Sequence, residues 1–370
     1  MIDGAVNIVL LLAILVGLVV IHELGHFVAA RRASVRVHEF GVGFPPRARI
    51  LHRGKETLWT LNWLPIGGFV RLEGEEGESV DPRAFVNQRL GTRLVILIAG
   101  VLMNFLLAWL IMSLIAGLAD PISQVRIASV QPGSPAAAAG LVGGVQTGTD
   151  EAGNAIFDKS GDLVVAVDGQ RFAIFDGLPS LDRPLVYLRS RAGEEVTLTV
   201  RHLDGSEEQK VVTLRSPAEA EANGALGVRI NGFESGSRTH GVVDAVVIGF
   251  WRTVDAATLI IRGVGDLITN IGDPQVAGPI GMVSIVGAYR ELPPTFLFWL
   301  IALLSANLAV INILPFPPMD GGRMAMAIAQ RLSGGRISVA TERAIYLTGF
   351  LALMGLLVWI SIVDLRRLAG

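Results

Sequence analysis

The stretch that decides the fold is the apolar run Ala5–Ala30, AVNIVLLLAILVGLVVIHELGHFVAA, which carries H-E-L-G-H at positions 22–26. Between Ala5 and Val20 the only polar side chain is Asn7. A run of this length can cross a bilayer as one helix. Residues four apart share one face of a helix, so the motif predicts two imidazoles that bind one metal ion.

The motif predicts the chemistry of a zinc hydrolase. His22 and His26 would be metal ligands, and Glu23 would be the general base that acts on water. Ionisable side chains are costly inside a membrane helix and usually serve a function there. The alternative, a pair of hydrogen-bonded core histidines, gives no reason for the adjacent glutamate.

Composition indicates a membrane protein with some soluble mass. The 370 residues are 51% hydrophobic and only 17% charged, whereas soluble domains carry about 25% charged residues. A formal net charge of −2 without a basic patch argues against a nucleic-acid partner. Cysteine is absent, so we expect no disulfides, and any zinc must be bound by histidine, carboxylate and water.

Apolar segments predict about four transmembrane helices. Their approximate bounds are Ala5–Ala30, Leu94–Leu118, Thr295–Leu314 and Ala344–Val363. Arginines gather between the first two segments and between the last two, which predicts that both loops are cytoplasmic. Both termini and the large segment between the second and third helices would then lie outside the cytoplasm. The first segment has no preceding Lys or Arg, so we expect a retained helix rather than a signal peptide.

The first predicted loop contains two apolar, β-prone stretches, Phe40–Pro46 and Leu58–Leu72, which Gly and Pro interrupt. Both are too short to span a bilayer. They predict membrane-associated β-hairpins that enter the protein at membrane depth, where irregular backbone survives only against protein or water. A hairpin on the membrane surface is the alternative.

The remaining chain divides by composition. Residues 123–216 predict a β-rich soluble domain with a Gly-, Thr- and Asp-rich insertion at 142–160. Within it Val125–Val130 alternates in hydropathy, and further short strands are expected at Val164–Val167, Glu195–Arg201 and Gln209–Leu214. Residues 217–293 form a connector in which Val243–Thr269 predicts an amphipathic helix, either on the membrane surface or in a soluble core. Residues 1–122 and 294–370 would be the two membrane regions.

A third metal ligand is expected, because a catalytic zinc usually binds three side chains and one water. The third predicted helix ends in N-I-L-P-F-P-P-M-D-G-G at 312–322. Its prolines cannot continue a helix, so the backbone unwinds and can direct Asp320 inward. Asp320 could instead cap the next helix. Because the chain also contains the histidine motif, we favour a role for Asp320 as the third metal ligand. Asn104 is a lone amide in the second helix. It would form either a hydrogen bond that joins two helices or one near the reaction centre.

In these motifs the chain resembles the site-2 protease family of intramembrane zinc metalloproteases. It is most similar to the bacterial RseP-like branch, which cleaves membrane-bound anti-sigma factors and remnant signal peptides. The matching motifs are H-E-L-G-H at 22–26, P-I-G-G-F at 65–69, G-x-x-x-N at 100–104, G-P-I-G at 278–281 and N-x-x-P-x-P-x-x-D-G at 312–321. The segments 133–136, 139–141 and 161–169 resemble a PDZ domain.

The resemblance implies one Zn²⁺ per chain, held by His22, His26 and Asp320. It implies that Glu23 activates water and that Asn104 and Asn312 lie near the substrate or the tetrahedral intermediate. The expected substrates are single-pass proteins in the cell (inner) membrane, cut in regulated intramembrane proteolysis, with the active site toward the cytoplasm.

The resemblance also implies that the PDZ-like domain is extracytoplasmic. There it would bind the C-terminus of a previously cut peptide or exclude substrates with bulky ectodomains. Relatives often carry two PDZ modules, whereas this chain has room for one, and the insertion at 142–160 alters its pattern. A metal transporter would be expected to string ionisable residues along several helices, and a catalytically silent scaffold would leave Glu23 unexplained.

Overall fold

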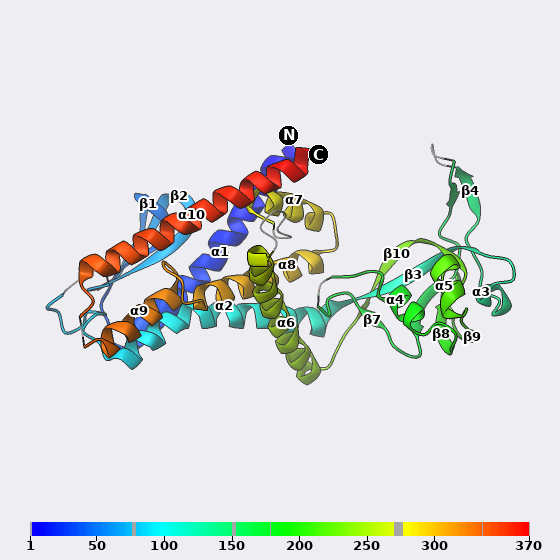
Figure 1. The fold of residues 1–370 in the computed structure, drawn as a ribbon, viewed down its shortest axis with the longest axis horizontal. Coiled ribbons are helices and arrows are strands. Elements are labelled where there is room, and N and C mark those ends of the chain that lie inside the picture. Colours follow the sequence, from blue (N-terminus) through cyan, green and yellow to red (C-terminus); the bar gives the residue numbers. More distant parts are fainter. Residues whose placement is uncertain are drawn as a thin grey trace. The chain divides into compact units, whose positions relative to one another are not determined.

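The computed structural model describes residues 2–75, 79–149, 153–177, 179–269, 277–334 and 336–369. Residues 150–152 of the predicted insertion and 270–276 of the predicted connector lie outside the described residues. The chain forms two compact units (Figure 1). We call Met1–Ile115 with Val246–Gly370 the membrane unit, and Ala116–Ala245 the β-rich unit.

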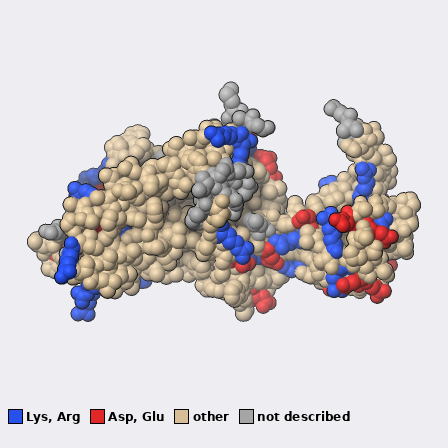
Figure 2. Space-filling view, viewed as in Figure 1, with Lys and Arg blue, Asp and Glu red and all other residues tan. Residues whose placement is uncertain are grey.

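Four helices are long and apolar enough to cross a membrane within the described residues. They are α1 (Ile2–Arg32), α2 (Leu90–Ala119), α8 (Pro294–Ile313) and α10 (Val339–Ala369). They coincide with the four predicted segments, so the prediction of a multi-pass helical membrane protein is confirmed. On the face seen in Figure 2, charged side chains are sparse over the membrane unit and frequent over the β-rich unit.

The two apolar stretches of the first loop form one sheet from β1 (Val37–Arg53) and β2 (Leu58–Leu72). The outer segment pairs are antiparallel, whereas the register of the central pair, 39–42 with 58–61, runs parallel. Each strand reverses direction near its prolines, so each contributes two segments to the sheet. Val42 pairs with both Leu61 and Gly68, and Leu61 also pairs with Arg49. The order of the four strand segments is therefore 67–72, 37–44, 58–62 and 47–53, which leaves the first and last of them as open edges.

Apolar contacts hold this sheet against α1. Phe40 and Trp59 of the sheet pack on Phe27 of α1, with ring centroids 5.7 and 5.1 Å from the Phe27 ring. Val37, Val70 and other sheet residues join the same buried cluster. Burial of this surface fixes the sheet beside the helix turn that carries the histidine motif.

The β-rich unit contains a six-stranded sheet in the order β10-β3-β6-β8-β9, with β7 paired to β3. These strands are β3 (Asp120–Val130), β6 (Leu163–Val167), β7 (Phe172–Ala173), β8 (Glu195–Arg201), β9 (Glu207–Thr213) and β10 (Val228–Arg238). The helices are α3 (Pro135–Ala138), α4 (Arg183–Ser190) and α5 (Pro217–Asn223), and a separate hairpin pairs β4 (Gln146–Thr149) with β5 (Ala155–Phe157). The edge strand β10 lies beyond residue 216, the end predicted from composition.

Three further helices complete the membrane unit: α6 (Val242–Thr269), α7 (Pro279–Arg290) and α9 (Asp320–Leu332). Phe250 of α6 packs on Trp109 of α2, with ring centroids 5.6 Å apart. The G-P-I-G motif begins α7, where the buried carboxylate of Asp364 accepts hydrogen bonds from the N–H groups of Gly278 and Gly281 at 3.2 and 2.8 Å. This motif therefore joins α7 to α10.

Candidate metal centre

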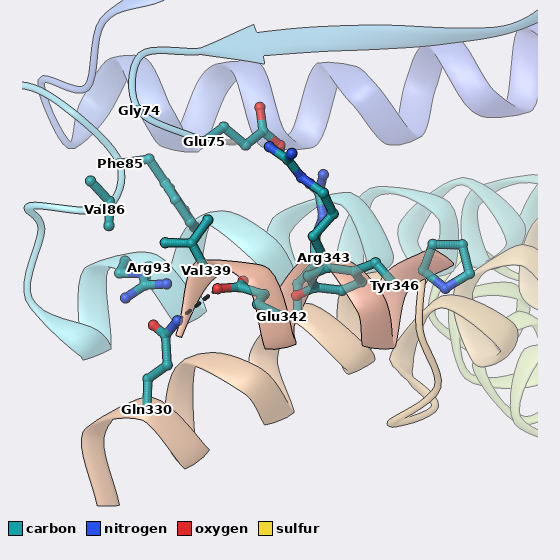
Figure 3. A pocket seen from close by; sticks show the side chains of 12 residues that line it. Gly74, Glu75, Phe85, Val86, Arg93, Gln330, Val339, Glu342, Arg343 and Tyr346 are labelled. Carbon is teal, nitrogen blue, oxygen red and sulfur yellow. Dashed lines mark hydrogen bonds and ion pairs between the residues drawn. The ribbon is translucent and has the colours of Figure 1, made fainter. Parts of the chain in front are cut away.

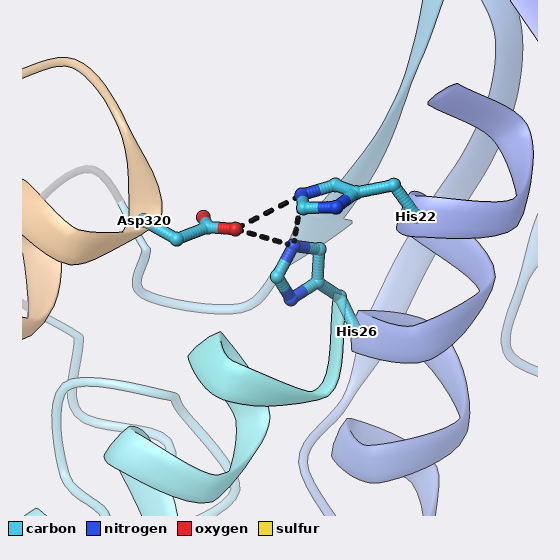
Figure 4. Close-up of side chains that lie close together, drawn as sticks. All are labelled: His22, His26 and Asp320. Atoms are coloured by element: carbon cyan, nitrogen blue, oxygen red, sulfur yellow. Dashed lines mark hydrogen bonds and ion pairs between the residues drawn. The ribbon is translucent and has the colours of Figure 1, made fainter. Parts of the chain in front are cut away.

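The two histidines of the motif lie one turn apart on α1, and both imidazoles are buried. Their Nε2 atoms are 3.1 Å from one another. The Oδ2 atom of Asp320 is 2.9 Å from Nε2 of His22 and 3.1 Å from Nε2 of His26 (Figure 4). Three potential ligand atoms from the two ends of the chain therefore converge within 4.8 Å of one another.

Asp320 reaches this point because the chain unwinds between α8 and α9. The prolines at 315, 317 and 318 interrupt the helix, and α9 begins at Asp320. The two glycines that follow allow α9 to fold back closely, since a Cβ atom at Gly321 would lie 2.2 Å from the Leu314 carbonyl oxygen. Met319, not Asp320, occupies the N-cap position.

Helices α1 and α2 approach closely at the histidines through two glycines. A Cβ atom at Gly25 of α1 would lie 2.3 Å from the Ala99 carbonyl oxygen. A Cβ atom at Gly100 of α2 would lie 2.4 Å from Nε2 of His26 and 2.8 Å from Cε1 of His22. Any larger residue at Gly100 would therefore fill the space into which the imidazoles point.

The residues present fit a zinc ion. Two imidazole nitrogens and one carboxylate oxygen are standard zinc donors, and three protein ligands leave a fourth position for water or substrate. Because residue 100 is glycine, the space beside both imidazoles stays open. An added Cβ atom would collide there with Nε2 of His26 and with the ring of His22. Buried nitrogen and oxygen atoms gathered this closely are stable when they share a cation or a proton.

Glu23 is the candidate base, and its side chain is partly buried. A Cβ atom at Gly68 would lie 3.7 Å from Cγ of Glu23, so the 67–72 edge of the sheet passes beside this residue. Within the described part of the chain, no hydrogen bond or ion pair engages the Glu23 carboxylate. The group is therefore available to water.

The two predicted asparagines are placed differently. Asn104 is fully buried, and its Nδ2 atom lies 3.3 Å from Nδ1 of His22. Asn312 lies in the last turn of α8 and donates a hydrogen bond to the Leu308 carbonyl at 2.9 Å. The structure thus brings Asn104 into contact with a candidate ligand, whereas the side-chain hydrogen bond given for Asn312 stays within its own helix.

One pair of residues near the centre was not predicted from the sequence. Arg323, in the first turn of α9, forms an ion pair with Glu75, which also accepts a hydrogen bond from the Leu72 N–H at 3.2 Å. Both line a cavity of about 370 Å³ that Arg93, Glu342 and Tyr346 also line (Figure 3). The pair joins the end of β2 to the helix that begins at Asp320. The only sequence signal was an arginine three residues after the aspartate.

An apolar helical unit with buried histidine, histidine and aspartate side chains around one point defines a membrane-embedded metallohydrolase. Comparison with known proteins agrees. Residues 10–356 match the model of peptidase family M50. The chain therefore belongs to peptidase family M50, and it is a site-2 zinc metalloprotease with Zn²⁺ as its cofactor. The predicted family, enzyme class and cofactor are thus confirmed.

Individual relatives carry corresponding names. A Nostoc protein named "Putative zinc metalloprotease" is 30% identical over 366 residues, which cover 96% of this chain and 95% of the relative. A Clostridium acetobutylicum protein of the same name is 28% identical, with 97% of each chain covered. Zinc metalloprotease RasP of Oceanobacillus iheyensis is 25% identical, with 95% of this chain and 96% of the relative covered.

Proposed function

We propose that this enzyme hydrolyses peptide bonds within or near the transmembrane segments of single-pass proteins. In this proposal His22, His26 and Asp320 hold zinc, and Glu23 is the general base. The observation that carries it is the convergence of the three donor atoms beside Glu23 in an apolar helical unit. The substrate class is that of anti-sigma factors or remnant signal peptides, cut in regulated intramembrane proteolysis.

When bound, zinc supplies a Lewis acid that polarises the scissile carbonyl and acidifies water. The Glu23 carboxylate takes the proton from the attacking water and later delivers it to the leaving amine. Asn312 is the candidate amide donor near the developing oxyanion, a contribution worth about 3 kcal/mol when such a donor is correctly placed. Asn104 contacts His22 instead.

The open edge at 67–72 is the proposed binding strand for substrate. A peptide bond inside a helix is protected by its own hydrogen bonds, so cleavage requires local unwinding. An unwound segment can add to an open sheet edge through main-chain hydrogen bonds. Because Gly68 lies beside Glu23, a strand bound at this edge would lie next to the base.

We assign the β-rich unit as a single PDZ-like domain outside the cytoplasm. The strand β10, with its open edge, and the Ser134-capped helix α3 support this assignment. The insertion hairpin is attached to β10, because Asn231 donates hydrogen bonds to the carbonyls of Phe157 and Asp158 at 2.9 and 2.7 Å. A hairpin fastened there favours a size filter over a peptide groove. The arginine-rich loops favour the inner membrane, with the active site toward the cytoplasm.

The test uses purified chain in detergent micelles, a single-pass substrate and the Glu23→Gln variant. We expect about one zinc per chain in both proteins, and cleavage only by the parent, since glutamine retains the shape but cannot accept the proton. Equal cleavage by the variant would remove Glu23 from the mechanism. Metal flux in vesicles without cleavage would favour a transporter. Binding of a peptide C-terminus by the parent would favour the groove over the filter.

A further inference from the structure

The pairing of one buried amide becomes unfavourable once His22 binds a metal through Nε2. The Nδ2 atom of Asn104 lies 3.3 Å from Nδ1 of His22, while Oδ1 of Asn104 is buried with no hydrogen-bond partner. A neutral imidazole that offers Nε2 to a metal carries its proton on Nδ1. Two donors would then face one another while an acceptor remains unused.

Exchanging the two ends of the amide removes this conflict. The oxygen and nitrogen of an asparagine amide have nearly the same shape, and their assignment follows from the hydrogen bonds that they make. When Oδ1 of Asn104 faces His22, it accepts the hydrogen bond that the Nδ1–H group of His22 donates. The NH₂ group then occupies the position in which the oxygen has no partner.

The second histidine has the corresponding contact from the same helix. Nδ1 of His26 donates to the Ile96 carbonyl oxygen at 2.8 Å. Ile96, Gly100 and Asn104 are spaced four residues apart and therefore form one stripe along α2. Ile96 contacts His26, Gly100 makes room for both imidazoles, and Asn104 contacts His22.

The backbone of Asn104 is also held in place. The hydroxyl of the buried Ser305, on α8, donates to the Asn104 carbonyl oxygen at 2.8 Å. The backbone at Asn104 is therefore fixed between α2 and α8, and the residue is fully shielded from solvent. A rigid acceptor of this kind can select one tautomer and one ring orientation of a histidine.

We infer that Asn104 is a positioning residue for His22, whose Nδ1–H it accepts so that Nε2 remains free to bind zinc. The inference rests on the proposed function, because it takes His22 to be a zinc ligand. Groups that orient a metal ligand typically change metal affinity by about 10–100-fold when removed. Loss of Asn104 should therefore weaken zinc binding and leave catalysis intact once the site is saturated.

The experiment measures the zinc dissociation constant of the full chain in detergent by competition with a chelator. The first variant, Asn104→Leu, keeps the side-chain volume and loses the hydrogen-bond acceptor. The second variant, Asn104→Asp, keeps an oxygen acceptor at the same position. Asn7→Leu is the matched control, an amide in α1 that lies fifteen positions before His22 in the sequence. Turnover is measured for each variant at limiting and at saturating zinc.

We expect Asn104→Leu to weaken zinc binding about 10–100-fold, with Asn104→Asp and Asn7→Leu close to the parent. At saturating zinc the turnover of Asn104→Leu should approach that of the parent. Unchanged zinc affinity in Asn104→Leu, with a persistent loss of turnover, would overturn the inference and assign Asn104 to the oxyanion.

A second variant covers poor folding of Asn104→Leu. The serine side chain of Asn104→Ser is too short to reach His22, so this variant should also weaken zinc binding. Unchanged zinc affinity with a persistent loss of turnover would again overturn the inference. Failure of the proposed function is seen separately, because His22→Ala and Asp320→Ala would then bind zinc as tightly as the parent.

Discussion

The Oδ2 atom of Asp320 lies 2.9 Å from Nε2 of His22, although 298 positions separate the two residues in the chain. The motif on α1 supplies only two donors, and the proline-interrupted turn before α9 supplies the third. In the proposed site, folding of the membrane unit is therefore a condition for metal binding.

Replacement of Asp320 by asparagine should abolish stable zinc binding. The change keeps the volume but removes the negative charge and one of three ligands. Elemental analysis of the purified chain should give less than about a tenth of the parent's zinc content. Asp244→Asn, in the first turn of α6, is the control and should retain zinc. Parental zinc content in Asp320→Asn would contradict the assignment.

Alanine at Gly100 should disrupt the centre through its volume. The added Cβ would lie 2.4 Å from Nε2 of His26, so α2 must move away from α1. Overpacking of this kind costs about 1–3 kcal/mol and should lower both zinc content and melting temperature. Gly17→Ala in α1 is the matched control, since nothing lies within 4 Å of its added Cβ. Equal effects of the two changes would refute the steric argument.

The ion pair between Glu75 and Arg323 should show coupling on charge reversal. Glu75→Arg and Arg323→Glu should each lower the melting temperature and the cleavage rate, because each places like charges beside one another. The double variant should recover part of both, with a coupling of about 1 kcal/mol. Additive losses in the double variant would mean that the two side chains act independently.

Strand addition at the 67–72 edge predicts a periodic effect of substrate N-methylation. Alternate residues of a strand direct their N–H groups toward the neighbouring strand. Methylation at every second position near the scissile bond should therefore slow cleavage more than methylation at the intervening positions. Measured cleavage rates without a period of two would exclude this binding mode.

The β-rich unit contains a pH-sensitive contact at His202. Hydrogen bonds from His202 to the carboxylates of Asp162 and Glu208 raise the pKa of the imidazole above its ordinary value of 6.5. Because the folded pKa exceeds the unfolded one, the stabilisation is fully present below about pH 6.5 and is lost as pH rises through the folded pKa.

NMR titration of the histidine side chains in the full chain measures this pKa, with the His202 signal assigned by its absence in His202→Gln. Asp162→Asn removes the carboxylate that contributes most and should lower the His202 pKa. A His202 pKa at or below 6.5 in the parent would rule out the contact.

Local sequence was sufficient for the four apolar helices of the membrane unit. The hydropathy of each apolar segment and the four-residue spacing of His22 and His26 are properties of a single helix, and α1 contains both as predicted. The prolines before Asp320 likewise end α8 through local geometry. Composition did not predict that β10 belongs to the β-rich unit, because its membership depends on pairing with β3, about one hundred residues earlier.

The sequence by itself determined the apolar helices, the histidine spacing and the break in the chain before Asp320, because each depends on neighbours a few residues apart. Only the tertiary structure decided that Gly25 and Gly100 bring α1 against α2, that the sheet edge at Gly68 passes Glu23, and that Asn104 meets His22. These contacts depend on close packing between segments distant in the chain, and a single sequence does not specify which surfaces will meet.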